Sequence, residues 1–440
     1  MLRALGDYLV LSWRFRRWSS KRIAKHQLRA LRRLLSYARA HSPFYQARFE
    51  GITFDTIDAV RRLPTLDKAT MMTHFDDLNT CGLKRASVEA FALNAERTQD
   101  YLGYYEGDYV IGLSSGTSGH RGLYITPKAL TKRLPGVFLA RGGLSLRDLP
   151  LRIVFLLRVY SQGFDDINAP LIQLKYMPTT AKPEAVIERI RAMRANVLMA
   201  PPSYLRFLLP HAADLAGRFK RIITYAEVLT AEDKARYAQA FNTSVVEIYQ
   251  ASEGQMASPC SQGHLHINED LVHVDLYDVQ GQRITEPGVI GHKMVVTNLI
   301  NTAQPLIRYV MNDMVVLDTP CPCGSNFRRI KQVLGRHDDV FYFPDATGKQ
   351  QPVFPDLIAR WLLVGDANIA EFQAIQKEHG TMHITIDPLK TPFDADALVK
   401  QLQGQLRTLG LEGTVTVYTG ALTIPKDSHK YKRFIQQDRH

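Results

Sequence analysis

The stretch 111–125 decides how this chain folds. It reads Ile111-Gly112-Leu113-Ser114-Ser115-Gly116-Thr117-Ser118-Gly119-His120-Arg121-Gly122-Leu123-Tyr124-Ile125. Glycine and hydroxyl residues lie between two apolar runs, which predicts a strand, a loop and a second strand. Glycine lets backbone N–H groups turn inward, and serine and threonine add short donors, so the loop can surround phosphate oxygens. A polar turn without a ligand has the same composition, so other stretches must decide between the two.

The loop differs from a Walker P-loop. That motif requires Gly-Lys-Ser or Gly-Lys-Thr at the start of a helix. Here His120 follows Gly119, and the residues after it favour a strand. A phosphate-binding role therefore needs support from other motifs.

Length and composition predict a soluble protein of more than one domain. The chain has 440 residues and a mass of 49.8 kDa, with 45% hydrophobic and 22% charged residues, which is typical of globular proteins. No run approaches the ~18 apolar residues of a membrane span, and the first residues lack the cleavage site of a signal peptide. Four cysteines are too few for a disulfide scaffold of this size. We therefore expect a cytoplasmic protein.

The middle of the chain predicts an α/β fold. Strand-like runs at 152–157, 196–200, 221–225 and 244–249 alternate with helical stretches at 183–194, 203–216 and 231–241. Such alternation predicts parallel or mixed sheets covered by helices, with ligands at the carboxyl ends of the strands. Short strands follow at 270–318. The last hundred residues predict a small α+β unit, with helices near 355–364 and 394–408 and strands near 370–376, 382–386 and 414–418.

Further motifs follow the loop along the chain. They are Ala226-Glu227, Tyr249-Gln250-Ala251-Ser252-Glu253, Leu306-Ile307-Arg308-Tyr309 with Asn312-Asp313, Gly335-Arg336-His337-Asp338-Asp339, and Ile424-Pro425-Lys426-Asp427-Ser428-His429-Lys430-Tyr431-Lys432-Arg433. Together with the loop they resemble, in type and order, the motifs of the adenylate-forming superfamily. That superfamily contains acyl-CoA synthetases, peptide-synthetase adenylation domains and luciferases. Each motif alone is common, whereas the full series in this order is hard to reach by chance.

Within the superfamily the chain is most similar to the phenylacetate–coenzyme A ligase branch, over roughly residues 25 to 435. The stretch His41-Ser42-Pro43-Phe44-Tyr45 and the Ser-Ser-Gly-Thr-Ser-Gly loop carry this resemblance. A relative in that branch is the synthetase that adenylylates a deazaflavin coenzyme. The chain departs from the usual pattern at His429, where glycine is common before the lysine, and at His120, where lysine is frequent.

The resemblance implies how the chain divides and which residues act. It implies a large N-terminal domain, residues 1–337, and a small mobile C-terminal domain, residues 338–440, with the hinge at Asp338. Lys430 and Glu253 would be the catalytic residues, with Glu253 holding Mg²⁺. The residues implied to bind ATP or AMP are Ser114, Ser115, Gly116, Thr117, Ser118, Gly119, Ala226, Glu227, Tyr249, Ser252, Asp313 and Arg336.

These roles imply an enzyme that uses ATP to convert an organic acid, aryl or of medium apolar size, into an acyl-AMP. The acyl group would then pass to the thiol of coenzyme A or of a carrier-protein phosphopantetheine. Two alternatives stay open: adenylylation of a phenolic hydroxyl of a cofactor, and a non-catalytic homologue that binds a partner. From strand ends and family position, the acid is expected beside Phe164, Asn168, Tyr204, Tyr225 and Gln250.

The cysteine spacing indicates a structural zinc site. Cys260 precedes two nearby histidines, and Cys321 and Cys323 form a second short cluster. Three thiolates and one imidazole are a set that tetrahedral Zn²⁺ accepts. His266 is the preferred fourth ligand because it matches a Leu-His-Ile-Asn stretch in part of the ligase branch, and His264 is the alternative. Buried free cysteines would explain the same residues without a metal.

Most of the net charge of +12 lies in the first 50 residues. This segment has twelve lysines and arginines against Asp7 and Glu50, a net charge of +10. Residues 20–40 predict a helix with an apolar face and a basic face. A solvated basic face explains the charge, and a docking face for an acyl carrier protein or an anionic membrane surface is the alternative. Nucleic-acid binding is not expected because none of its motifs is present, and a homodimer stays open.

Overall fold

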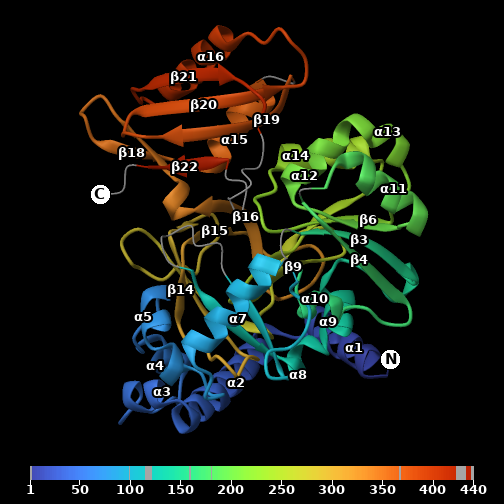
Figure 1. Cartoon of the computed structure of the whole chain (residues 1–440). Helices are drawn as coiled ribbons and strands as arrows, with labels where there is room; N and C mark the ends of the chain where they lie inside the picture. The colour runs from blue at the N-terminus through green and yellow to red at the C-terminus, as the bar shows by residue number, and fades with distance from the viewer. Residues whose placement is uncertain are drawn as a thin grey trace.

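The computed structural model describes residues 2–98, 100–113, 121–157, 160–179, 181–365, 368–422 and 433–437. Figure 1 shows a larger lower part, made of the blue, green and yellow segments, and a smaller upper part in orange and red. Within the described ranges, none of the helices combines the length and the apolar character that crossing a membrane requires.

The N-terminal region is helical and lies along the bottom of the larger part (Figure 1). Its helices are α1 (Leu2–Arg17), α2 (Ser20–His41), α3 (Pro43–Arg48), α4 (Ile57–Arg61), α5 (Lys68–Thr73), α6 (Phe75–Leu78) and α7 (Arg85–Thr98). Ser19 caps the start of α2, because its side chain accepts a hydrogen bond from the backbone N–H of Arg22 at 3.3 Å. The buried face of α2 is apolar, as its sequence period predicts, and includes Leu31 and Leu35.

The two strands around the phosphate-loop stretch form as predicted. They are β1 (Tyr109–Leu113) and β2 (Leu123–Pro127), and they pair antiparallel with Leu113 opposite Leu123. Helices α8 (Lys128–Thr131) and α9 (Leu134–Arg141) follow. This pairing brings the two ends of the loop side by side at one edge of the larger part.

A five-stranded parallel sheet with the order β4-β3-β5-β6-β7 follows. Its elements are β3 (Leu151–Leu157), α10 (Gln162–Asp165), β4 (Ile172–Pro178), α11 (Pro183–Met193), β5 (Val197–Met199), α12 (Pro202–Leu208), α13 (Ala212–Leu215), β6 (Arg221–Thr224), α14 (Ala231–Ala240) and β7 (Val245–Glu247). Val154 and Leu198 on one face pack in the same core as α11 and α12, and their chain neighbours Ile153 and Val197 pack on the other face with α9. This alternation is the period-two pattern of strands buried on both faces.

The prediction for this region is confirmed except at the edge strand β4, which it missed. In β4, buried Ile172 and Leu174 alternate with exposed Gln173 and Lys175. The alternation is the usual signal of a half-buried strand, but it is short and begins close to a turn.

The remaining strands of the larger part form a six-stranded sheet, with the order β12-β15-β16-β10-β9-β8, and a three-stranded sheet, with the order β11-β13-β14. Their bounds are β8 (Tyr249–Ala251), β9 (Gly254–Pro259), β10 (Leu265–Ile267), β11 (Val272–Tyr277), β12 (Ile290–Gly291), β13 (Lys293–Asn298), β14 (Tyr309–Met311), β15 (Asp313–Leu317) and β16 (Arg329–Arg336). A single 3-10 turn at His337–Asp339 connects β16 to the upper part.

The upper part has a hydrophobic core of its own. It contains β17 (Phe341–Pro344), β18 (Gln350–Val353), α15 (Pro355–Gly365), β19 (Ile369–Gln376), β20 (Thr381–Pro388), α16 (Ala395–Thr408), β21 (Thr414–Thr419) and β22 (Phe434–Gln436). The four-stranded sheet has the order β21-β20-β19-β22. The helices and strands expected after residue 350 all form, because their apolar periods coincide with buried positions such as Phe372, Ile384 and Leu402.

Candidate active site

A cavity of about 960 Å³ lies between the two parts. Its walls come from β7, β8, β14, β15, β16 and the turn after β6 in the larger part and from α15 and β22 in the upper part. Seven of the residues predicted to bind nucleotide or metal line it: Ala226, Glu227, Tyr249, Ser252, Glu253, Asp313 and Arg336. The fold therefore brings together residues that the sequence spreads over more than a hundred positions.

The other predicted nucleotide residues lie in or beside stretches outside the described ranges. Ser114, Ser115, Gly116, Thr117, Ser118 and Gly119 belong to such a stretch, and so does Lys430. Their neighbours in sequence are described: Leu113 lines the cavity at the end of β1, and Arg433 lines it before β22. Asp338 is described only through its backbone, in the 3-10 turn between the two parts.

Glu253 lies in the turn between β8 and β9. Its Oε1 accepts a hydrogen bond from the Tyr124 hydroxyl at 2.8 Å, and the Tyr124 hydroxyl lies 3.2 Å from that of Tyr309. Burial raises the pKa of Glu253, and the negative charge of Asp313 adds to the rise. Because burial disfavours the charged form of this carboxylate, a nearby cation would stabilise it. Carboxylate oxygens are also ligands that Mg²⁺ accepts. Sequence reading missed Tyr124 because it lies beyond the loop motif, in β2.

Asp313 and Arg336 face each other across neighbouring strands. They are directly paired residues of β15 and β16, and Arg336 Nε lies 3.8 Å from Asp313 Oδ1. Burial opposes the charge on Arg336, but the negative charges of Asp313 and Asp339 raise its pKa. Tyr249 lies close by, and burial together with the charge of Asp313 raises the pKa of its hydroxyl. This corner of the cavity therefore combines a fixed cation, a carboxylate and a neutral phenol.

Glu227 has a structural partner that the sequence did not indicate. Its carboxylate accepts hydrogen bonds from the backbone N–H of Ser203 at 2.9 Å and from the Ser203 hydroxyl at 2.8 Å. Ser203 is in the first turn of α12, where a negative charge is favourable. The preceding residue, Ala226, has a φ of +67°, a conformation that non-glycine residues rarely adopt. These bonds hold the turn after β6 against the wall of the cavity.

Away from the charged corner, the cavity wall is apolar. Its apolar residues include Leu11, Leu130, Leu134, Val137, Phe138, Phe155, Phe164, Ile167, Leu174, Met199 and Tyr225. Of the residues expected beside the acid, Phe164, Tyr225 and Gln250 line the cavity. Asn168 and Tyr204 are not among the residues that line it. Asn168 accepts from the N–H of Leu174 at 2.7 Å, and the Tyr204 hydroxyl donates to the carbonyl of Ala181 at 2.6 Å.

Four buried charged side chains join the two parts beside this cavity, and we call them the charge cluster: Arg206 of α12, Asp233 of α14, Glu371 of β19, and Arg433. Arg206 donates to both carboxylate oxygens of Asp233 at 2.9 Å, and Arg433 donates to both oxygens of Glu371 at 2.8 and 3.1 Å. Cross-contacts of 3.4 Å from Arg206 to Glu371 and 3.6 Å from Arg433 to Asp233 close the cluster. No sequence motif predicts this cluster.

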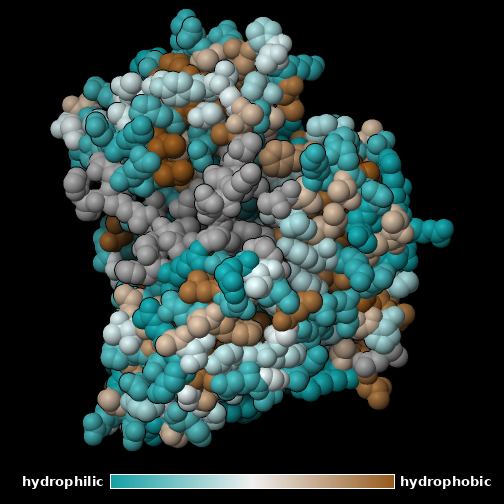
Figure 2. Space-filling model, viewed as in Figure 1, coloured by the Kyte–Doolittle hydropathy of each residue, from teal (hydrophilic) through white to brown (hydrophobic). Residues whose placement is uncertain are grey.

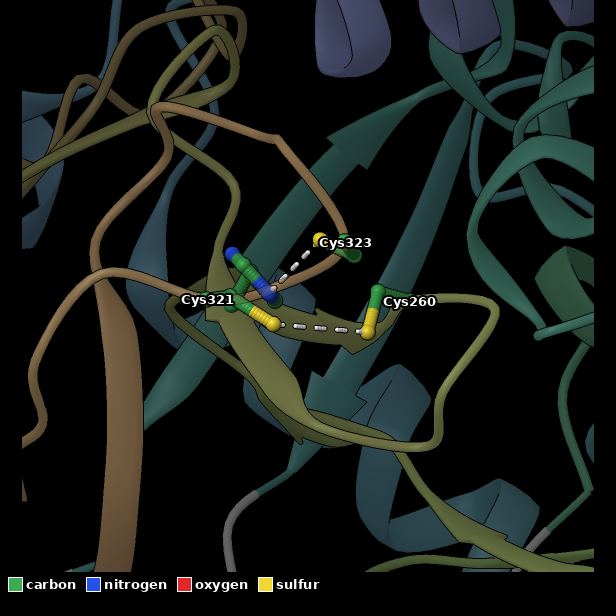
Figure 3. A group of neighbouring side chains, drawn as sticks. Cys260, Cys321 and Cys323 are labelled. Atoms are coloured by element: carbon green, nitrogen blue, oxygen red, sulfur yellow. Dashed lines mark hydrogen bonds between the residues drawn. The ribbon is translucent and has the colours of Figure 1, made fainter.

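The cysteine–histidine cluster consists of Cys260, His266, Cys321 and Cys323, whose ligand atoms all lie within 4.8 Å of one another. Figure 3 shows the sulfur atoms of the three cysteines turned toward a common space. Cys260 Sγ lies 4.0 Å from Cys321 Sγ, and Cys323 Sγ lies 3.6 Å from His266 Nε2. Three sulfurs and one nitrogen in this compact arrangement fit tetrahedral Zn²⁺.

The choice between the two histidines favours His266. Its Nδ1 lies 2.8 Å from the carbonyl oxygen of Phe327, so an Nδ1–H can donate there while Nε2 faces the cysteines. Zinc-binding histidines are commonly oriented in this way. Burial lowers the pKa of His266, which favours the neutral form that binds a metal. His264 lies outside the compact set and approaches only Cys321, at 3.2 Å.

Comparison with known proteins identifies chains of similar sequence and fold. No family model matches the chain. A phenylacetate-coenzyme A ligase of Thermus thermophilus is 23% identical over 396 residues, which cover 82% of this chain and 80% of the ligase. The solved structure of 2-hydroxyisobutyryl-CoA ligase in the postadenylation state, with 2-HIB-AMP, superposes with a TM-score of 0.74 at 17% identity, covering 97% of this chain and 92% of that one.

A second structure of the same ligase, in a different state, also has a similar fold. With 2-HIB-AMP and CoA in the thioesterification state, its TM-score against this chain is 0.59 at 18% identity, covering 96% of this chain and 91% of that one. These comparisons confirm the predicted resemblance to phenylacetate–CoA ligase and the predicted α/β fold class.

Proposed function

Because the chain has the fold of the adenylate-forming CoA ligases, we propose that it activates an organic carboxylic acid with ATP and passes the acyl group to coenzyme A. The observation that carries the proposal is the convergence of the predicted nucleotide residues on one cavity, with the carboxylate of Glu253 in its wall. The 3-10 turn at His337–Asp339 supports a division into domains 1–337 and 338–440 with a hinge at Asp338.

The first half-reaction needs placement and positive charge more than a nucleophile from the protein. A carboxylate oxygen of the acid attacks the α-phosphorus of ATP, and pyrophosphate leaves. The loop residues 114–119 would donate to the β- and γ-phosphates, and Asp313 would accept from the ribose hydroxyls. Mg²⁺, when bound, would supply positive charge that offsets the charge of the phosphates. Glu253, oriented by Tyr124 at 2.8 Å, is the side chain placed to hold it.

Lys430 would provide the mobile cation between the acid and the α-phosphate. Support comes from its neighbour: Arg433, three positions later, lines the cavity and is fixed by Glu371. The resemblance to the family motif assigns this role to Lys430, and Arg433 ties the end of that motif to the cavity wall. A single donor at a developing charge can lower the activation free energy by ~3 kcal/mol.

The apolar wall indicates the class of acid. Phe164 and Tyr225 both contact Phe155, with their ring centroids 5.0 and 5.4 Å from that of Phe155. Aromatic and aliphatic walls of this kind favour an aryl acid or an acid of medium apolar size, since burying its carbon atoms contributes ~25 cal/mol per Å².

We also assign the cysteine–histidine cluster to structural Zn²⁺. Four protein ligands leave no open position for substrate, so the metal would brace the loop before β16 against β9 and take no part in the reaction.

The test is exchange of labelled pyrophosphate into ATP over a panel of aryl, aliphatic and hydroxylated acids. We expect acid-dependent exchange, and formation of a CoA thioester when CoA is added. Glu253→Gln and Lys430→Ala should each reduce exchange about 100-fold or more, whereas the exposed controls Glu412→Gln and Lys400→Ala should not. Exchange only with a phenolic cofactor, or none with any acid, would refute the proposal. Transfer to a carrier-protein phosphopantetheine but not to CoA would correct the acceptor.

A further inference from the structure

Helix α1 is held firmly against the larger part by one of its faces. Tyr8 and Leu11 are buried there, and Asp7 pairs with Arg133, whose Nη2 lies 2.6 Å from Asp7 Oδ1. The contact with α9 is close, since a Cβ added at Gly136 would lie 2.4 Å from the carbonyl oxygen of Ala4. The orientation of α1 is therefore fixed, and its opposite face points away from the protein.

That opposite face is apolar and open to solvent. The exposed fractions of its large side chains are 87% for Leu2, 40% for Leu5, 54% for Leu9, 47% for Val10 and 45% for Trp13. Spacings of three and four residues place Leu2, Leu5, Leu9 and Trp13 along one side of a helix. A surface helix normally has polar residues there, so an outer apolar stripe of this length needs a partner. Figure 2 shows hydrophobic residues at the lower right edge, where Figure 1 places α1.

The charges around the stripe are positive. Arg3, Arg16 and Arg17 are exposed on α1 itself. The next helix presents the exposed residues Lys21, Arg22, Lys25, Arg29, Arg32 and Arg33. No Asp or Glu occurs between residues 8 and 49, and Asp7 faces inward to its arginine. A matching partner must therefore present an apolar region that can bury these side chains, together with negative charge.

We propose that the outer face of α1 docks on the surface of an anionic lipid bilayer. Leu9 and Trp13 would enter the boundary between headgroups and acyl chains, and the arginines would lie among the phosphates. A second copy of this chain fits less well, because it would bring two strongly basic surfaces together. The helix would lie in the interface without crossing the bilayer, which agrees with its 16 residues.

The inner face of α1 connects the proposed membrane contact to the cavity. Leu11 of α1 and Val137 and Phe138 of α9 form part of the apolar wall of the cavity. A single helix thus contacts the cavity on one face and the outside on the other. Apolar acids partition into membranes, so docking here would hold the apolar end of the cavity next to their reservoir.

Tryptophan emission provides the first test. Of the three tryptophans, Trp18 and Trp361 are buried and Trp13 is exposed. Vesicles of equimolar phosphatidylcholine and phosphatidylglycerol should shift the emission of the full-length protein to shorter wavelength, and vesicles of phosphatidylcholine alone should shift it less. Trp13→Phe should abolish the shift. No shift with the anionic vesicles, or a shift that persists in Trp13→Phe, overturns the proposal.

Co-sedimentation with the same vesicles provides the second test. The variant Leu9→Glu/Trp13→Glu should lower the partition coefficient at least about tenfold. The matched control is Val279→Glu/Leu389→Glu, which makes the same charge change at exposed apolar residues elsewhere and should bind nearly as wild type. Circular dichroism verifies that α1 and the fold persist. Equal loss in both variants would reduce the effect to net charge and overturn the proposal. So would a dimer in solution that the α1 variant dissociates while wild-type protein ignores vesicles.

Discussion

The cysteine–histidine cluster and the charge cluster both join segments far apart in the chain, but they differ in the chemical groups that they bring together. The first gathers Cys260, His266, Cys321 and Cys323 within the larger part, on and beside strands of one sheet. The second contains one arginine–carboxylate pair in each part, Arg206–Asp233 and Arg433–Glu371. Contacts of 3.4 Å from Arg206 to Glu371 and 3.6 Å from Arg433 to Asp233 join the two pairs across the boundary. The charge cluster balances two positive against two negative side chains, whereas the cysteine–histidine cluster consists of groups that bind metal ions. The proposed zinc ion would hold the first cluster together, and ion pairs within the protein hold the second.

Removing the metal from the cysteine–histidine cluster should have the largest effect. Cys260→Ser/Cys321→Ser should abolish zinc binding and lower stability by on the order of 5 kcal/mol or more, because structural zinc sites contribute folding free energy directly. Metal analysis of purified protein and thermal melts with and without a chelator measure this. The control Cys81→Ser lies outside the cluster and should keep its metal. Wild-type protein that contains no zinc and is indifferent to chelator would contradict the assignment.

Breaking the charge cluster should come next. Arg433→Met removes both hydrogen bonds to Glu371 and should cost about 3 kcal/mol, because a buried carboxylate loses its main partner. Glu371→Gln tests the same contact from the other side. In a double-mutant cycle measured by urea unfolding, the two changes should couple by about 2 kcal/mol. Additivity within about 0.5 kcal/mol would mean that the cluster does not act as a unit.

The two clusters also differ in how far sequence could predict them. Cys321-Pro322-Cys323 and the motif around Glu253 are both recognisable within a few residues of sequence. The cysteine–histidine cluster and much of the cavity lining could therefore be predicted from the sequence. Arg206 and Glu371 have no local signal, because a buried arginine looks like an exposed one in sequence. Their role depends on how two separately folded parts meet.

The same reason explains the other misses. Asn168 and Tyr204 follow strands, as ligand-binding residues often do, but bonds to Leu174 and Ala181 use their polar atoms. The two apolar faces of α1 could not be assigned to inside and outside until the position of α9 was known. Periodic elements were predicted well, and pairings across elements were not.

Glu247 offers a half-buried carboxylate in the cavity wall, without an arginine partner of the kind that the charge cluster provides. Burial raises its pKa to about 7 from 4.5, and Lys234 offsets only part of the rise. Its raised pKa means that stability is highest below pH 4.5 and is lost as pH rises through about 7. Glu247→Gln should remove this slope and gain on the order of 2 kcal/mol relative to wild type at about pH 8.

Urea unfolding of both proteins at several pH values between about 5 and 8 measures the difference. Glu371→Gln serves as the contrast, because it removes the partner of Arg433 and should lower stability where Glu247→Gln raises it. If the free energy of unfolding of wild type and Glu247→Gln changed with pH in parallel, ionisation of Glu247 would not destabilise the protein, and the prediction would be wrong.

The smallest effect is expected at the exposed pair Arg191–Asp214, which isolates burial as the cause. It joins α11 to α13 at 3.2 Å, with side chains 54% and 57% exposed, whereas Arg206–Asp233 joins α12 to α14 at 2.9 Å with both side chains 2% exposed. Residue types and distances are nearly the same. Replacing either exposed partner with alanine should change stability by less than about 0.5 kcal/mol, and less still in high salt, because water solvates both charges.

The same replacements at Arg206 or Asp233 should cost about 3–5 kcal/mol, since each leaves a charge buried without its partner. Urea unfolding at low and high salt compares the two pairs directly. If the exposed pair cost as much as the buried one, the strength of the charge cluster would come from Arg–Asp contact itself. Its location between the two parts would then explain nothing about how they hold together.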